Sequence, residues 1–266
     1  MHRRRSLALW LFFFVTVIAG LLQPAVSGGR STIVDSLDPS TIPTGILYDL
    51  VAPFSRIEVH DGSRSAPPVG TAQWKQMVFE LERAALSVPT WSPLARVLDQ
   101  TRDDLRRGVV PLVVLSIEYN RIRPGAMEDG TLAIESNRLI QRGRDPYTRE
   151  LAHAVTALKD YTHRGSDVTF VLQRNSYLTN LSDQPAKIEI DFDDGHGYTL
   201  KAFDQPAHVS YSRPGRKTIR TRITLAGGDV LYSGFVFDVQ HLQTPTPHDT
   251  LTITATIPYD AGYGTG

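Results

Sequence analysis

The feature that most constrains the fold is a regular succession of short strand-like segments after residue 166. Each segment has alternating or β-branched character, and turns rich in Gly, Pro, Asp and Asn separate it from the next. The segments are residues 167–172, 186–192, 198–203, 208–211, 217–225, 230–239 and 250–257. Strands that recur about every ten residues with turns between them indicate an antiparallel sandwich. We therefore predict a β-sandwich over residues 166–258 and a Gly-rich tail or linker over residues 259–266.

Residues 28–165 mix helix and strand signals. Apolar residues recur at three- and four-residue steps within residues 72–86, which predicts an amphipathic helix. A second helix is predicted within residues 92–108, where Ser92 is a candidate cap and Pro93 stands at the first helical position.

A third helix is predicted from Asp145-Pro146 to Gly165. Its apolar stripe is formed by Tyr147, Leu151, Ala154, Val155 and Leu158. His153 and His163 lie ten residues apart on different faces of this helix, and we expect them at the surface.

Three further segments predict strands in the same region. Residues 109–119 form a nearly continuous β-branched run that predicts a buried strand, and residues 131–134 predict a short strand near it. The apolar island 46–57 is expected to lie across the folded body and contribute a strand or two. With a boundary placed near Ser166, the sequence predicts an α+β protein in which a mixed region precedes a sandwich.

Residues 1–27 have the pattern of a signal peptide. The basic start MHRRR precedes an apolar run over residues 7–22, and the small residues at 25–27 form a cleavage site. The run is short for a spanning helix, which needs roughly 20 residues, although an uncleaved N-terminal anchor is the alternative. The chain has no cysteine, which excludes a lipid-anchored lipoprotein and all disulfides. We expect an exported protein of a bacterial envelope, in the periplasm, on the cell surface or secreted.

The charge balance argues against a nucleic-acid partner, because such proteins carry a basic patch or stripe. The 28 Lys and Arg residues match 28 Asp and Glu residues, and the formal net charge is zero. The sequence contains neither the GxSxG motif of a nucleophile elbow nor the HExxH motif of a zinc enzyme. We therefore expect no cofactor and assign no catalytic residue.

The densest cluster of potentially reactive side chains is IEIDFDDGHGY at residues 188–198. On a strand, Asp191 and Asp193 share one face, where two carboxylates could bind a hard cation with His196 as a third ligand. The acidic spacing does not fit an EF-hand loop. The same two aspartates could instead form the acid–base pair of a glycosidase. A third interpretation is structural, because Asp before Gly is ordinary turn chemistry.

This cluster and the stretch that follows it resemble the PKD domain, an immunoglobulin-like extracellular module. The resemblance covers the acidic turn at residues 191–195, the YSRPG turn at residues 211–215, the strand at residues 217–225 and the Gly-Gly-Asp hairpin at residues 227–229. Asp193 stands where the family usually has glycine, and the tryptophan that often precedes the motif is absent. The resemblance implies that Asp191 and Asp194 hold the turn and that Tyr211 packs beside it.

PKD domains act as spacers or bind proteins and polysaccharides, so the resemblance implies a non-catalytic interaction or spacer module at the cell surface. The whole chain is also similar to the N-terminal region of larger exported proteins of Bacteroidetes-type bacteria. The alternative is therefore an accessory region of a secreted hydrolase whose catalytic domain lies beyond residue 266. Aromatic residues alternate along the strands, and any on an outer face could stack on sugar rings: Tyr198, Phe203, Tyr211, Tyr232, Phe235 and Phe237.

Overall fold

The computed structural model describes residues 39–136, 138–159 and 162–241. Two α-helices, three short 3-10 helices and eleven strands make up this part of the chain. Of the predicted α+β fold, a β-rich structure with some helix is confirmed. The predicted signal peptide, the strand at residues 250–257 and the Gly-rich tail lie outside the described residues.

Four strands form the first sheet, which we call sheet one, in the order β4-β1-β6-β9. The central strand β1 (Val109–Ile122) is antiparallel to β4 (Tyr147–Ala157) and parallel to β6 (Asp167–Thr179). The edge strand β9 (Ala207–Ser210) is antiparallel to β6. Strands on both sides of the boundary predicted near Ser166 therefore share one sheet.

Five strands form sheet two, in the order β5-β11-β10-β7-β8. They are β5 (His163–Arg164), β7 (Pro185–Asp191), β8 (Tyr198–Lys201), β10 (Gly215–Leu225) and β11 (Val230–Gln240). A tight turn joins β10 to β11, because the Leu225 and Asp229 backbones are hydrogen-bonded at 2.8 Å. This hairpin confirms the Gly-Gly-Asp turn predicted there.

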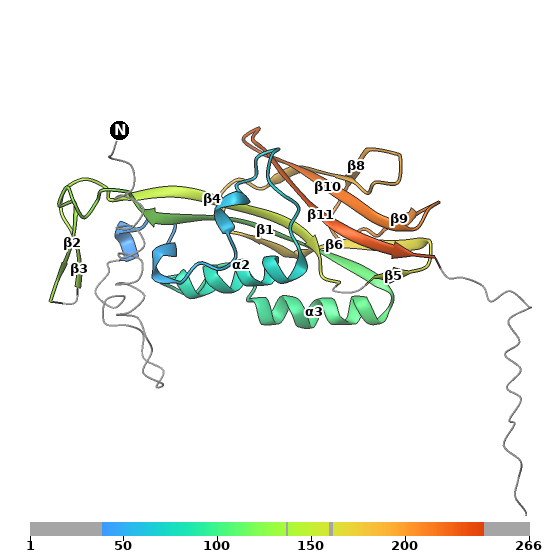
Figure 1. Cartoon of the computed structure of the whole chain (residues 1–266), viewed down its shortest axis with the longest axis horizontal. Helices are drawn as coiled ribbons and strands as arrows, with labels where there is room; N and C mark the ends of the chain where they lie inside the picture. Colours follow the sequence, from blue (N-terminus) through green and yellow to red (C-terminus); the bar gives the residue numbers. More distant parts are fainter. Residues whose placement is uncertain (1–38, 137, 160–161, 242–266) are drawn as a thin grey trace, which may run out of the picture.

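The elements pack in three layers (Figure 1). The inner sides of both sheets share one hydrophobic cluster, which includes Phe170, Ile190 and Phe235. The helices α2 (Thr71–Ala84) and α3 (Leu94–Arg106) cover the other face of sheet one and share a second cluster with it. Sheet one is thus buried on both faces, which explains the nearly continuous apolar run of β1.

A smaller hairpin lies beyond one end of sheet one (Figure 1). Its strands are β2 (Leu132–Glu135) and β3 (Arg138–Gln141), which pair with each other as a separate two-stranded sheet. The strand predicted at residues 131–134 is confirmed as β2, and its pairing partner is β3.

The predicted third helix is wrong, because this segment forms β4 and pairs with β1 from Ile122↔Tyr147 to Leu112↔Ala157. Residues 152–157 are all buried, since both faces of sheet one are covered. The apolar residues of this segment fit helical spacing as well as a strand that is buried on both faces, so periodicity could not separate the two. His153, expected at the surface, is completely buried on β4, and His163 lies partly exposed on β5.

The apolar island at residues 46–57 is also not a strand. It forms the 3-10 helix η3 (Tyr48–Leu50) and leads into η4 (Ile57–Val59), and its strand-like contacts are isolated bridges to Ala85, just after α2, and to Asn120 of β1. The prediction that it lies across the folded body is confirmed, because its apolar side chains join the core under the helices.

The first two predicted helices are confirmed as α2 and α3. The predicted Ser92 cap is wrong, since the structure gives α3 no side-chain cap and Pro93 occupies the cap position. The carboxylate of Glu82 on α2 accepts a hydrogen bond from the Leu94 backbone at 2.6 Å instead. A negative charge at this helix end is favourable, because the first backbone N–H groups point toward it.

Residues 60–69 close the gap between the two sheets, and we call this segment the seam. The His60 carbonyl accepts a hydrogen bond from His153 on β4, and the Gly62 carbonyl accepts one from Tyr232 on β11. Gly62 has φ +80°, and a Cβ there would lie 3.0 Å from the Leu231 side chain. Only glycine fits this position without strain. In the described part of the chain, no helix is long and apolar enough to cross a membrane.

Candidate functional site

The acidic turn after β7 uses its carboxylates to bind its own backbone. Asp191 accepts a hydrogen bond from the Asp193 amide at 3.0 Å, and Asp194 accepts one from the His196 amide at 3.1 Å. Asp193 has φ 58°, and its side chain accepts the Thr218 amide of β10 at 2.8 Å. Asp tolerates this left-handed conformation better than most residues because its short side chain bonds locally.

The Tyr211 side chain anchors the same turn from the core. Its hydroxyl donates to the Phe192 carbonyl at 2.9 Å, and the Phe192 ring stacks on Phe170 with ring centroids 5.0 Å apart. Burial, helped by the nearby carboxylates, raises the pKa of the Tyr211 hydroxyl, which stays a donor. The prediction that Asp191 and Asp194 hold the turn and that Tyr211 packs beside it is confirmed.

The candidate metal ligands are not brought together as a set. The His196 side chain is exposed, and its Nδ1 lies 3.2 Å from Asp194, a residue outside the candidate set of Asp191, Asp193 and His196. Burial alone would raise the pKa of Asp194, but hydrogen bonds from His196 outweigh it, and the pKa lies below its usual value. Within the described ranges, no group of three acidic or histidine side chains is arranged to hold a metal ion.

The outer face of sheet two presents a different set of side chains, of which sequence analysis named Tyr198 and Tyr232 and missed the others. Strand pairing places Leu200, Glu189, Arg222 and Tyr232 in one row across β8, β7, β10 and β11. The next row holds Tyr198, Asp191, Arg220 and Gly234. We define the tyrosine–arginine face as Tyr198, Leu200, Arg220, Arg222 and Tyr232 together with Arg64 of the seam.

Arg222 is fixed at the centre of this face. Its Nε and Nη2 donate to the two carboxylate oxygens of Glu189, both at 2.8 Å, and its guanidinium lies 4.7 Å from the Tyr198 ring centroid. Lys187 adds an ion pair to Glu189 at 2.8 Å. These bonds from Arg222 and Lys187 lower the pKa of Glu189 to about 2, so the carboxylate stays ionised.

Arg64 brings the seam onto the same face. Its Nη2 donates to the Tyr232 hydroxyl at 2.9 Å, and its guanidinium lies 4.9 Å from the centroid of the Tyr232 ring. Apolar side chains border the face: Leu200 is 68% exposed, Val236 is 43% exposed and Val230 is 37% exposed. The other predicted aromatics lie in or against the core, namely Phe203, Tyr211, Phe235 and Phe237.

A buried carboxylate lies under α2. Glu80 accepts hydrogen bonds from the Tyr48 and Ser55 hydroxyls at 2.5 Å, from the Phe54 and Ser55 amides, and from Gln76. Burial alone would raise the pKa of Glu80, but these hydrogen bonds outweigh it, and the pKa lies below its usual value. The ionised carboxylate holds the segment after η3 against the helix and has no access to a substrate.

Two buried histidines lie where the seam meets sheet one. The Nδ1 atom of His153 is 2.8 Å from the Ser116 hydroxyl, and burial lowers the pKa of His153 to about 3. Burial also lowers the pKa of His60. A Ser–His pair is a familiar catalytic arrangement, but Ser116 and His153 are both completely buried, so this pair belongs to the core.

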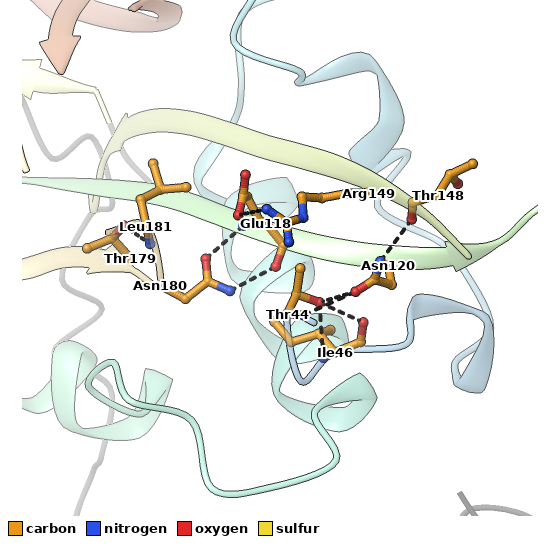
Figure 2. A network of polar contacts seen from close by, with 9 residues as sticks. All are labelled: Thr44, Ile46, Glu118, Asn120, Thr148, Arg149, Thr179, Asn180 and Leu181. Carbon is orange, nitrogen blue, oxygen red and sulfur yellow. Dashed lines mark hydrogen bonds and ion pairs between the residues drawn. The ribbon is translucent and has the colours of Figure 1, made fainter. Parts of the chain in front are cut away.

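Two asparagines extend the hydrogen bonding of sheet one (Figure 2). The Asn120 side chain accepts from the Thr44 hydroxyl at 2.8 Å and donates to the Thr148 carbonyl at 3.2 Å. The Asn180 side chain accepts the Glu118 amide at 2.8 Å and donates to the Glu118 carbonyl at 2.9 Å. Asn180 thus continues the ladder on β1 after β6 ends, which is a structural role.

A shallow depression of about 650 Å³ lies over the seam and the adjoining residues. Its polar groups bond one another: Asp61 accepts the Ser63 amide at 2.9 Å, and the Ser63 and Ser65 hydroxyls are 3.1 Å apart. Hydrogen bonds from Ser63 lower the pKa of Asp61. These contacts shape the loop.

The side chains thus divide into internally bonded clusters and the open tyrosine–arginine face. The sequence matches no protein-family model, and a search of the curated proteins finds no match. Any function must therefore be argued from this geometry.

Proposed function

We propose that the chain is an exported, non-catalytic module that works by binding a protein or glycan at the cell surface. The tyrosine–arginine face carries this proposal, because it presents rings and guanidinium groups on an open sheet. Tyr and Arg are enriched where proteins bind their partners. The other polar clusters support the proposal, because the carboxylates of the acidic turn and of Glu80 already accept hydrogen bonds from the backbone and from neighbouring side chains.

We further propose that the two sheets form a β-sandwich of the PKD, immunoglobulin-like type. The shared core between the sheets and the Tyr211–Phe192 contact at the acidic turn support this assignment. In such a module the acidic turn is a structural feature and needs no metal.

The experiment compares the wild-type chain with Asp191→Asn and Asp193→Asn on ester and glycan substrate panels. The proposal expects the same background rate for all three proteins, and a hydrolytic rate that both substitutions abolish would reject it. Calorimetric titration with calcium is expected to show no heat and no change in melting temperature. Export is tested by N-terminal sequencing of the protein recovered outside the cytoplasm, with a new terminus expected at Gly28.

A further inference from the structure

We propose that the tyrosine–arginine face docks a protein that presents an acidic patch bordered by apolar side chains. This inference rests on the proposed function and names the class of partner that the module binds. The argument has four parts: the charge of the face, its apolar border, the state of its rings and its size.

The charge of the face is positive. Lys187 and Arg222 share the single carboxylate of Glu189, so this group of three carries one net positive charge. Arg220 lies 3.9 Å from Asp191, which makes that pair approximately neutral. Arg64 adds a further positive charge, and in the described part of the chain its partner is the Tyr232 hydroxyl. An acidic surface complements this pattern, and like charges disfavour a second copy of the same face.

The border of the face is apolar and open. Leu200, Val230 and Val236 point outward on β8 and β11, and the three side chains are between 37% and 68% exposed. Aliphatic groups gain by removal from water, and a protein surface can supply apolar atoms beside its carboxylates. A hydrated acidic polysaccharide would place hydroxyl groups against them.

The rings decide between these two classes of partner. A sugar binds tyrosine by stacking on the ring, but a guanidinium already lies over each tyrosine of this face: Arg222 over Tyr198 and Arg64 over Tyr232. With these contacts, and with Arg222 bonded to Glu189 and Arg64 to Tyr232, the four side chains form a pre-ordered platform. Pre-ordering reduces the entropy that binding must overcome, which favours a flat protein contact.

The size of the face predicts a weak interaction. On β11 the face and its apolar border run from Val230 to Val236, so the face extends roughly 20 Å along the strands and roughly 14 Å across from β8 to β11. The resulting area of roughly 300 Å² is smaller than the ~800 Å² per partner of a standard interface. We therefore expect fast, salt-dependent association and easy dissociation.

The test uses the full chain in the cells that produce it. The photoreactive residue p-benzoylphenylalanine replaces Leu200 on the face or, as a control, the exposed Arg102 on α3. Illumination is expected to link position 200, and not position 102, to one protein that mass spectrometry identifies. That protein is then purified and titrated with wild-type chain, Arg64→Glu, Arg220→Glu and Arg102→Glu.

The inference expects at least tenfold weaker binding for Arg64→Glu and for Arg220→Glu, a change of less than twofold for Arg102→Glu, and weaker binding at higher salt. The inference is overturned if position 200 forms no crosslink or is linked to a second copy of the chain. It is also overturned if the linked protein binds Arg64→Glu and Arg220→Glu with the same affinity as the wild-type chain. Binding of polygalacturonate that Arg64→Glu abolishes would also overturn it in favour of a polysaccharide.

The two proposals fail in different ways. A protein partner that crosslinks at position 102, or through another surface, leaves the binding function intact and rejects the docking face. A hydrolytic activity that depends on Asp191 and Asp193 rejects the function itself. Melting temperatures of all variants are compared with wild type, so that loss of binding is not confused with loss of folding.

Discussion

The two sheets share one core but differ in what covers them. Helices cover the outer face of sheet one, and sheet two covers its inner face. The polar side chains around sheet one, such as Asn120 and Asn180, are hydrogen-bonded within the protein. Sheet two is covered on one side only, and its outer face carries Tyr198, Arg222 and other exposed side chains. Substitutions around sheet one should therefore cost stability, whereas those on the outer face of sheet two should change binding.

The largest effect is expected at Glu80, beneath the helix layer. Glu80→Ala leaves the amides and hydroxyls that bind the carboxylate without a partner, and we expect a loss of about 3–5 kcal/mol in the free energy of unfolding. Urea unfolding measures it. Exposed Glu58→Ala is the control and should change stability by less than about 0.5 kcal/mol. A loss below about 1 kcal/mol for Glu80→Ala would show that the cluster is dispensable.

The seam between the sheets comes next. Gly62→Ala combines a left-handed backbone with a clash against Leu231, and we expect a loss of about 2–4 kcal/mol. Gly130→Ala is the matched control, because Gly130 also has positive φ but nothing within 4 Å of the added Cβ, so only the backbone strain of about 1–2 kcal/mol remains. Hydrogen exchange should also quicken at the Tyr232 amide, which Gly62 holds. Equal losses in the two variants would argue against the clash.

The free energy of unfolding should decrease as the pH is lowered, because the two buried histidines are neutral in the folded protein. The folded-state pKa of His153 lies at about 3, below its unfolded value of about 6.5, so the unfolded chain binds the extra proton between these limits. Stability is therefore complete above pH 6.5 and decreases by up to about 1.4 kcal/mol per pH unit below it. His60 acts in the same direction. Urea unfolding between pH 7.5 and 4 should show a smaller slope for His153→Asn, and an unchanged slope would contradict this assignment.

The smallest effect on stability is expected on the tyrosine–arginine face. Leu200→Ser removes an exposed apolar side chain, and we expect a change of less than about 0.5 kcal/mol in the free energy of unfolding. Leu231→Ser, at an inward position on β11 of the same sheet, should cost several times more because Leu231 is buried in the shared core. Thermal unfolding of the two variants measures the ratio of their losses in stability. Comparable losses would mean that the outer face is also a structural surface.

Local patterns predicted much of sheet two and of the acidic turn. The strands β7, β10 and β11 alternate apolar and polar residues because one side of the sheet is buried. The turn at Asp191 and Asp194 was predictable because its hydrogen bonds join residues two apart in sequence. Where a strand is buried on both sides, as in β4, alternation disappears, and a helix was predicted in its place.

The tyrosine–arginine face could not be found in this way. Alternation along β10 places Arg220 and Arg222 on one face, but it does not indicate which strands lie beside them. The contact between Arg64 and Tyr232 joins residues 168 positions apart, and no local pattern encodes such a pairing. Register between distant strands depends on the packed core, which periodicity along one segment does not describe.

The seam also sets the order in which the protein can be completed. Residues 60–69 leave the ribosome early, but their partners at Tyr232 and Gly234 belong to the last described strand, β11. The parallel partner of β1, strand β6, likewise follows it by tens of residues. Such contacts between distant segments slow folding, because long loops must close before the contacts form. The seam therefore cannot join the two sheets until β11 has been synthesised, and the earlier strands depend on protection from aggregation until then.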